Sequence, residues 1–226
     1  MSDANFQSSA YRTIREDIVY CRLEPGQKLS AKSLEERLGI GRTPVREALV
    51  RLGQQGLVST IPQSGTYVSK INLHEAENAR FVRENLEKSI AIECCARMDD
   101  SGVERLSSLI AQQEQAVATR EAIEFFQLDN AFHEELFRIA GRHDIWRWIA
   151  GNNTDLERFR WLRVQVTELD WETIMSQHHR LFDALCGRNP EEARFLTGAH
   201  LHLMVTEQES VVAAFPAYFE EVSTSR

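Results

Sequence analysis

The sequence predicts a mainly α-helical protein, with an N-terminal winged helix-turn-helix followed by a C-terminal antiparallel bundle of six to seven helices. Before about residue 70, short helical segments alternate with Pro and Gly, whereas no proline occurs between Pro62 and Pro190. The charge also changes sign: residues 1–70 carry a net charge of +3 and the remainder a net charge of −11, which gives the total of −8. Such a change of character predicts two domains, residues 1–70 and 71–226.

Composition excludes several broad classes. The 226 residues are 42% hydrophobic and 27% charged, which is typical of a folded globular chain. The sequence contains no uncharged run of 18 apolar residues, and residues 1–10 are polar. We therefore expect neither a membrane span nor a secretory signal. The four cysteines form no CxxC pair. We therefore expect free thiols and a cytoplasmic location.

The first 56 residues predict three short helices. Apolar residues recur at helical spacing over residues 11–19, and Ser30 is an expected N-cap of a second helix that ends at Gly39. In the third helix we expect Thr43 to be the cap and Pro44 to occupy the first turn, where a missing N–H costs nothing.

Two β-prone runs follow, residues 57–61 and 66–69, and the turn Pro62-Gln63-Ser64-Gly65 between them predicts a hairpin. After a linker at 71–73 the pattern is helical almost to the end, with residues 222–226 as a frayed tail. Ser101 with Glu104 predicts a capping box, and Asn189 before Pro190 predicts a strong helix start. The expected helices span residues 73–98, 102–118, 121–140, 143–165, 170–187 and 190–214.

The second and third helices and the Gly-containing turn between them form a helix-turn-helix pattern. Such a motif lays its second helix in the DNA major groove, and the exposed face of that helix begins with Arg42, Thr43 and Arg46. Arginine can read guanine or grip phosphate, and the turn at Ser64-Gly65 could act as a wing. From the residues alone, a purely structural hairpin with solvated arginines remains an alternative.

A resemblance to a known family makes this interpretation more specific. Leu23-Glu24-Pro25-Gly26-Gln27-Lys28-Leu29, followed by Gly39-Ile40-Gly41-Arg42-Thr43-Pro44-Val45-Arg46-Glu47-Ala48-Leu49, resembles the GntR family of bacterial transcription regulators. Gly41 departs from the family pattern, which usually has Ser or Thr there, so one DNA contact could be missing. The resemblance implies DNA contact by Lys32, Arg42, Thr43, Arg46, Ser64 and Gly65.

The second half contains a candidate metal constellation. Asp129 and His133 are four residues apart and share one face of a predicted helix, while His179 and His200 lie on two later helices. Three imidazoles and a carboxylate suit zinc or another first-row divalent ion. Spacing alone leaves open that these are unrelated helical histidines.

This half is similar to the helical ligand-binding domain of the FadR-type GntR branch, through Asp129-Asn130-Ala131-Phe132-His133-Glu134 and the segments around His179, Asn189 and His200. The metal-binding members of that branch have ligands matching Asp129, His133, His179 and His200. The resemblance thus implies a divalent metal, zinc first, with nickel, manganese or iron as alternatives, and excludes an acyl-CoA effector. His178 and His202 point elsewhere on their helices and are interpreted as non-ligands.

Arg83, in the first helix of this half, stands where the branch often has an arginine lining its cavity. It could clamp the carboxylate of a small organic acid effector with two hydrogen bonds. An ordinary surface ion pair with Glu87 is the alternative. The four tryptophans, Trp146, Trp148, Trp161 and Trp171, are expected in the core or in dimer contacts.

Together these features predict a ligand-responsive transcription regulator, expected to be a repressor and not an enzyme. A homodimer would present two recognition helices to a palindromic operator in double-stranded DNA. One alternative is a direct metal sensor, in which the ion itself is the signal. A more remote one is a metalloenzyme, for which Glu134 is the only candidate base, chosen solely by its proximity in sequence.

Overall fold

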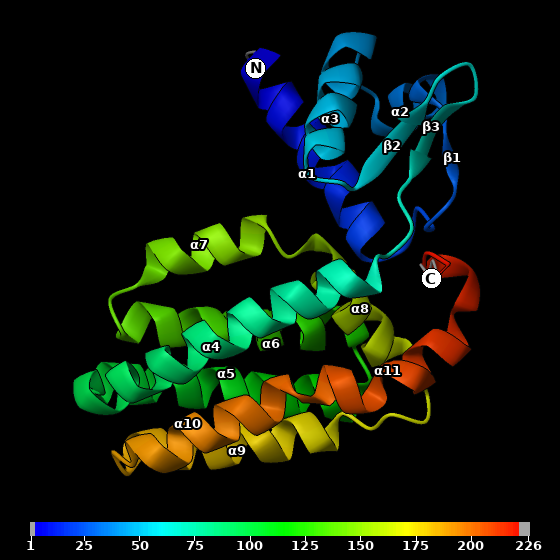
Figure 1. Cartoon of the computed structure of the whole chain (residues 1–226). Helices are drawn as coiled ribbons and strands as arrows, with labels where there is room; N and C mark the ends of the chain where they lie inside the picture. Colours follow the sequence, from blue (N-terminus) through cyan, green and yellow to red (C-terminus); the bar gives the residue numbers. More distant parts are fainter. Residues whose placement is uncertain (1–2, 222–226) are drawn as a thin grey trace. The chain divides into compact units, whose positions relative to one another are not determined.

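A computed structural model describes residues 3–221 of the chain, and side chains from residue 9 onward (Figure 1). Two compact units form. One contains residues 3–76, 154–159 and 212–221, and the other contains residues 77–153 and 160–211. The predicted domain boundary at residue 70 stays a prediction. The two compact units do not correspond to it directly, because short later segments also belong to the first unit. The predicted tail, residues 222–226, lies outside the described residues.

The first unit is a helical cluster with a small antiparallel sheet, in the order β1-β3-β2. Ile14, Ile18, Val45, Leu52 and Leu57 are fully buried in its core. Burying these side chains is what holds the three helices together. Its elements are α1 (Asp3–Val19), β1 (Lys28–Leu29), α2 (Ala31–Leu38), α3 (Arg42–Gln54), β2 (Val58–Ile61) and β3 (Gly65–Val68).

The caps of α2 are confirmed, whereas that of α3 differs from the prediction. The Ser30 side chain accepts a hydrogen bond from the Ser33 N–H, and Gly39 ends α2 in the left-handed region with φ 64°. The N-cap of α3 is Gly41, in an extended conformation and without a side-chain bond. Thr43 is therefore already inside the first turn, so its predicted capping role was wrong.

The predicted hairpin is confirmed, and a third strand joins it. β3 pairs with β2 on one side and with β1 on the other. A two-residue strand has too little periodicity to be read from sequence. Gly65 has φ +136°, and a Cβ there would lie 2.8 Å from Lys28 Cε. Both the backbone conformation and the close approach of Lys28 therefore favour glycine at this turn.

The second unit is helical, as predicted, but two of the predicted helices are each divided into two shorter ones. The expected helix at 143–165 is interrupted at Asn152 and Asn153, which are poor helix formers next to Gly151. The expected helix at 190–214 is interrupted at His202, where no proline or glycine signals it. The helices are α4 (Leu73–Arg97), α5 (Asp100–Thr119), α6 (Ala122–Ile139), α7 (His143–Gly151), α8 (Thr154–Gln165), α9 (Glu172–Cys186), α10 (Pro190–Leu201) and α11 (Leu203–Ala214); α4 and α8 begin with residues of the first unit.

Helix caps define how these helices start. Asn189 caps α10 by accepting from the Glu192 N–H, as predicted. The predicted capping box at Ser101 was wrong, because Asp99 caps α5 instead and the Ser101 hydroxyl donates to it. Short connections link α5 to α6 and α9 to α10, and α5 also contacts α9 (Figure 1). This packing brings α6, α9 and α10 around one interior. None of the described helices is both long and apolar enough to span a membrane.

Candidate metal centre and nucleic-acid interface

The outward face of α3 carries the three predicted DNA-contacting side chains. Val45, Ala48 and Leu52 turn into the core of the first unit. Arg42, Thr43 and Arg46 are consequently exposed, and neither arginine forms an ion pair with the side chains of residues 9–221. Their guanidinium groups are therefore available to an external acceptor.

Other basic residues of the first unit are engaged in its structure. Arg37 and Arg22 both bond the buried carboxylate of Asp17, at 2.7 and 3.2 Å, and Arg51 stacks 3.8 Å above the Tyr11 ring. Arg22, Arg37 and Arg51 therefore stabilise the unit, whereas Arg42 and Arg46 are free to contact DNA.

Lys32, on α2, lies at the surface with its side chain 85% exposed. It faces Glu36 at 3.8 Å, an exposed pair that contributes little to stability. At the tip of the hairpin, the exposed Ser64 hydroxyl lies 2.7 Å from the Tyr67 hydroxyl, beside Gly65. Sequence reasoning missed that exposed Lys28 joins this tip, with its ammonium 5.8 Å from the Tyr67 ring centre.

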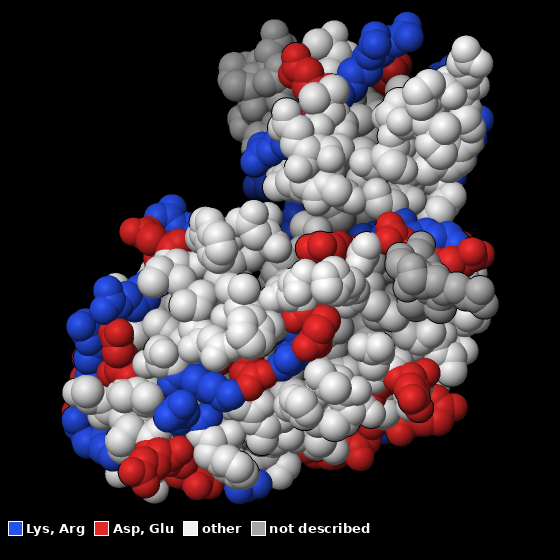
Figure 2. All heavy atoms as spheres, viewed as in Figure 1, with Lys and Arg blue, Asp and Glu red and all other residues white. Residues whose placement is uncertain are grey.

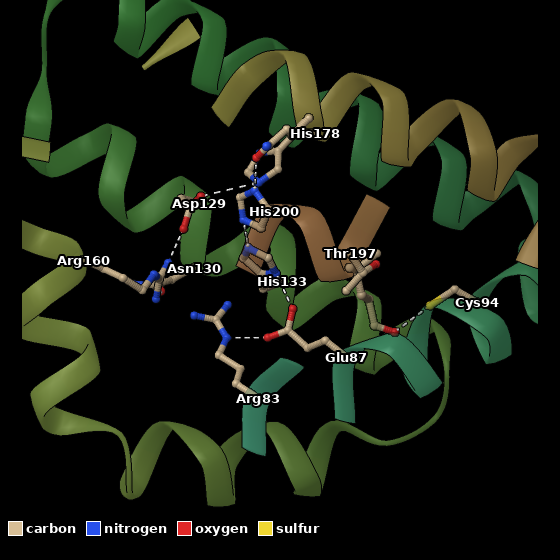
Figure 3. A network of polar contacts seen from close by, with 12 residues as sticks. Arg83, Glu87, Cys94, Asp129, Asn130, His133, Arg160, His178, Thr197 and His200 are labelled. Carbon is tan, nitrogen blue, oxygen red and sulfur yellow. Dashed lines mark hydrogen bonds and ion pairs between the residues drawn. The ribbon is translucent and has the colours of Figure 1, made fainter. Parts of the chain in front are cut away.

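In the second unit, four buried side chains converge from three helices (Figure 3). Asp129 and His133 come from α6, His178 from α9 and His200 from α10. One ligand atom from each can be chosen so that all four lie within 4.8 Å of one another. As predicted, the spacing of four places Asp129 and His133 on one helix face.

The structure places His178 in this cluster and not the predicted His179. On α9 the residues Ile174, Leu181 and Leu185 are buried, and His178 falls in phase with them. His179 is turned by about 100°. Its side chain is 47% exposed and its Nε2 lies 3.0 Å from Glu114. The apolar period of α9 is the signal that could have identified the inward histidine.

Each of the three histidines is held by its Nδ1 atom. His133 Nδ1 lies 2.6 Å from the Glu87 carboxylate, His178 Nδ1 lies 2.8 Å from Gln113 Oε1, and His200 Nδ1 lies 2.9 Å from Gln177 Oε1. The Gln113 amide nitrogen donates to the Leu128 carbonyl, which directs its oxygen toward His178. Because all three acceptors are oxygens, each Nδ1 carries the proton and each Nε2 presents a lone pair.

These lone pairs meet at one point. The Nε2 atoms of His133 and His200 are 3.1 Å apart, and His178 Nε2 is buried without a hydrogen-bond partner, 3.5 Å from Asp129 Oδ1. Nitrogen ligands about 2.0–2.1 Å from a tetrahedral zinc are separated by about 3.3 Å. The donor set, its spacing and its unpartnered nitrogen therefore fit a first-row divalent cation.

The electrostatics of the cluster favour a positive ion. Burial alone would raise the pKa of Asp129, but Arg160 and the three histidines outweigh it and lower that pKa far below its ordinary value. Burial lowers the pKa of His178 to about 3 and also lowers that of His200. The site thus holds an anionic carboxylate, and burial favours the neutral imidazole form of His178 and His200, the form that binds metals.

Arg83 is neither a surface ion pair nor a free side chain. Its Nε donates to Glu87, as the ion-pair alternative expected, yet both side chains are 0% exposed. Burial would raise the pKa of Glu87, but the charges of Arg83 and His133 lower it to about 2. The two terminal nitrogens of Arg83 are buried and lack a hydrogen-bond partner among the described residues, although the guanidinium carbon lies 5.4 Å from the centre of the Trp146 ring.

Sequence reasoning missed the residues around the cluster. Glu87, Gln113 and Gln177 hold the histidines, and Arg160 bonds Asp129 and, at 2.8 Å, Asn130. They lie on four helices, so only the tertiary fold brings them together. Glu134, the candidate base for an enzyme, instead faces His143 Nε2 at 2.6 Å.

The tryptophans divide as core and surface residues. Trp146, Trp161 and Trp171 are buried, and the Trp171 indole N–H donates to the Val164 carbonyl. Trp148 is 59% exposed. The buried three are therefore core residues, as one of the two predicted alternatives had it.

Solved structures share this fold. Escherichia coli McbR/YncC aligns with a TM-score of 0.79 over 93% of this chain and 99% of that one, at 18% identity. A GntR-type putative transcriptional regulator from Rhodococcus sp. RHA1 aligns with a TM-score of 0.73 over 92% and 98%, also at 18% identity. At this identity the likeness is one of fold.

Sequence comparisons give the family. Residues 6–68 match the family described as bacterial regulatory proteins, gntR family, and residues 79–203 match the FCD domain. The HTH-type transcriptional repressor RspR of Escherichia coli K12 is 32% identical over 84% of this chain and 83% of its own length. A regulator in an unstable DNA locus of Streptomyces ambofaciens is 32% identical over 92% and 87%. This chain therefore belongs to the GntR family of bacterial transcriptional regulators and carries an FCD domain, consistent with the FadR-type branch.

Proposed function

We propose that this DNA-binding regulator is a repressor whose helical unit holds a divalent metal and binds a small organic acid as effector. The observation that carries the proposal is the convergence of Asp129, His133, His178 and His200, with three Nε2 atoms directed at one point. Zinc is the first expectation, and nickel, manganese or iron suit the same ligands. RspR, named a repressor, supports the direction of control.

DNA contact is assigned to the exposed residues of the first unit. Arg42, Thr43 and Arg46 would enter the major groove, with Lys32 on phosphate and the turn at Ser64-Gly65 as the wing. Effector binding in the helical unit would change the affinity for operator DNA, which requires the acid to bind the DNA-free and DNA-bound states unequally.

The first test combines metal analysis with a stability screen. Purified protein should contain about one divalent ion per chain, and a small carboxylic acid should raise its melting temperature only while that ion is present. The same acid should then weaken binding to a duplex selected by the protein from random DNA. The control is the chelated protein in the same acid.

Each other outcome identifies a different function. If the metal alone changes DNA affinity and no acid does, the direct metal sensor replaces this proposal. If the protein holds no metal and no acid stabilises it, the proposal is overturned. Chemical turnover of a bound acid would instead favour the metalloenzyme. Its candidate base, Glu134, faces His143.

The homodimer is proposed to form through α4 and α10. Phe81 on α4 and Phe195 on α10 are 62% and 66% exposed, and a groove of about 930 Å³ lies between these helices. Lys88, Arg194 and Glu191 line it, so a two-fold pairing can set opposite charges against one another. Figure 2 shows this face as white surface around blue and red groups.

Phe195→Glu should therefore convert the dimer to a monomer in sedimentation equilibrium, because it introduces a charge at an apolar contact. We expect the dissociation constant of the dimer to rise about tenfold or more, as for the loss of a buried aromatic contact. Trp148→Glu is the matched control, since Trp148 is 59% exposed but lies outside the groove. Equal effects of both substitutions would remove the α4–α10 surface from the dimer.

A further inference from the structure

The β2–β3 hairpin of the first unit carries no charged side chain of its own. Residues 55–69, which contain both strands and the turn between them, include no Asp, Glu, Lys or Arg. Lys28 lies on β1, opposite Tyr67 of β3, and its side chain is exposed. It forms no ion pair with the side chains of residues 9–221. A residue outside the hairpin therefore brings an uncompensated positive charge to it.

The side chain of Lys28 extends to the turn of this hairpin. A Cβ at Gly65 would lie 2.8 Å from Cε of Lys28 and 3.5 Å from its ammonium nitrogen. The same nitrogen lies 5.8 Å from the centre of the Tyr67 ring, whose hydroxyl is 2.7 Å from the Ser64 hydroxyl. The alkyl chain of Lys28 thus crosses the glycine, and its ammonium group lies beside the turn, in reach of an external anion.

This arrangement supplies what the proposed wing otherwise lacks. Affinity for DNA comes largely from basic side chains that neutralise phosphates, whereas uncharged donors fix position and contribute less. Ser64 can offer a hydroxyl and Gly65 a close approach of the backbone, but neither carries a charge. An ammonium group is a compact point charge without the planar donor pair that matches a guanine edge, so it suits a phosphate better than a base.

We propose that Lys28 is the phosphate-contacting residue of the wing and reaches the DNA backbone from β1, across Gly65. This inference rests on the proposed DNA contact at Ser64-Gly65 and adds the residue that gives that contact its charge. It also gives the glycine a second role, because any side chain at position 65 would displace the lysine from the turn.

The dependence of DNA affinity on salt concentration measures this contact. Fluorescence anisotropy gives the affinity of the full-length protein for a duplex selected from random DNA, at several concentrations of KCl. Each lost phosphate contact lowers the slope of log affinity against log salt by about 0.9. Lys28→Met should therefore lower the slope by about one per half-site and weaken binding about three- to tenfold per half-site at fixed salt. Lys28→Arg should keep the slope.

Lys70→Met is the matched control for the lost charge. Lys70 is also an exposed lysine of the first unit, but it follows the end of β3 that leads into α4, away from the turn. Its substitution should leave the slope unchanged. The melting temperature of Lys28→Met should equal that of the unsubstituted protein, because the side chain is exposed.

Gly65→Ala tests the path of the lysine across the glycine. The added methyl group should displace Lys28 and lower the slope, whereas in a Lys28→Met background it should leave the slope unchanged. Strain at φ +136° can weaken binding in both backgrounds, but strain releases no counterions and does not alter the slope.

The outcomes separate this inference from the function on which it rests. An unchanged slope for Lys28→Met, or an equal decrease for Lys70→Met, would overturn the assignment of Lys28 while operator binding itself stands. Loss of a preference between duplexes that differ at a single base pair would show that Lys28 reads a base, and would also overturn the phosphate contact. If the unsubstituted protein selects no duplex from random DNA, the proposed DNA contact itself fails.

Discussion

His178→Ala is expected to abolish retention of the metal, whereas His179→Ala is expected to leave it intact. The two histidines are neighbours in sequence but not in environment. His178 is fully buried with a free Nε2 beside Asp129, and His179 is half exposed beside Glu114. After gel filtration, the first variant should contain almost no divalent ion, and the second about one per chain.

Stability gives an independent measure of the same difference. A ligand present at 1,000 times its dissociation constant stabilises a folded protein by about 4 kcal/mol. Chelation should therefore lower the melting temperature of the unsubstituted protein and of His179→Ala, but not that of His178→Ala. Comparing the three in chelator removes the separate cost of truncating a buried imidazole. Retention of metal by His178→Ala together with its loss from His179→Ala would restore the original assignment.

The histidine pair shows where the sequence was sufficient and where it was not. The resemblance identified the correct helices and three of the four clustered residues, but it shifted the fourth by one position. A one-residue shift on a helix turns the side chain by about 100°, from interior to surface. The burial of Ile174, Leu181 and Leu185 fixes the phase of α9, and those residues are visible in the sequence.

Residues that act through tertiary contact could not be found in the same way. Gln113 on α5 and Arg160 on α8 have no motif, and they reach the cluster only because α5, α6, α8 and α9 pack around it. Local signals succeeded where the physics is local, as at the Ser30 and Asn189 caps. They failed at Thr43 because the helix starts two residues earlier than predicted, at Arg42, with Gly41 as cap.

Arg46→Ala should weaken binding to the selected operator by about 1–3 kcal/mol per half-site, or about 5- to 150-fold, if the guanidinium reads a base. Arg46 is exposed on α3, opposite the buried Val45, Ala48 and Leu52, and forms no ion pair with the side chains of residues 9–221. The substitution therefore removes a DNA contact without disturbing the core, and the melting temperature should not change. Fluorescence anisotropy with the selected duplex measures the loss.

A base contact and a phosphate contact differ in what else they change. Loss of a base contact relaxes sequence preference at one position, whereas loss of a phosphate contact weakens all sequences alike and lowers the salt dependence by about one ion. Arg46→Ala should therefore bind two duplexes that differ at the position it reads with equal affinity. Lys32→Ala should reduce the dependence of affinity on salt concentration and keep the sequence preference. Arg147→Ala, at an arginine of α7 that is 69% exposed and outside the α4–α10 groove, controls for the lost charge. Unchanged operator binding by Arg46→Ala would remove this residue from the interface and transfer base reading to Arg42, the other unpaired arginine of α3.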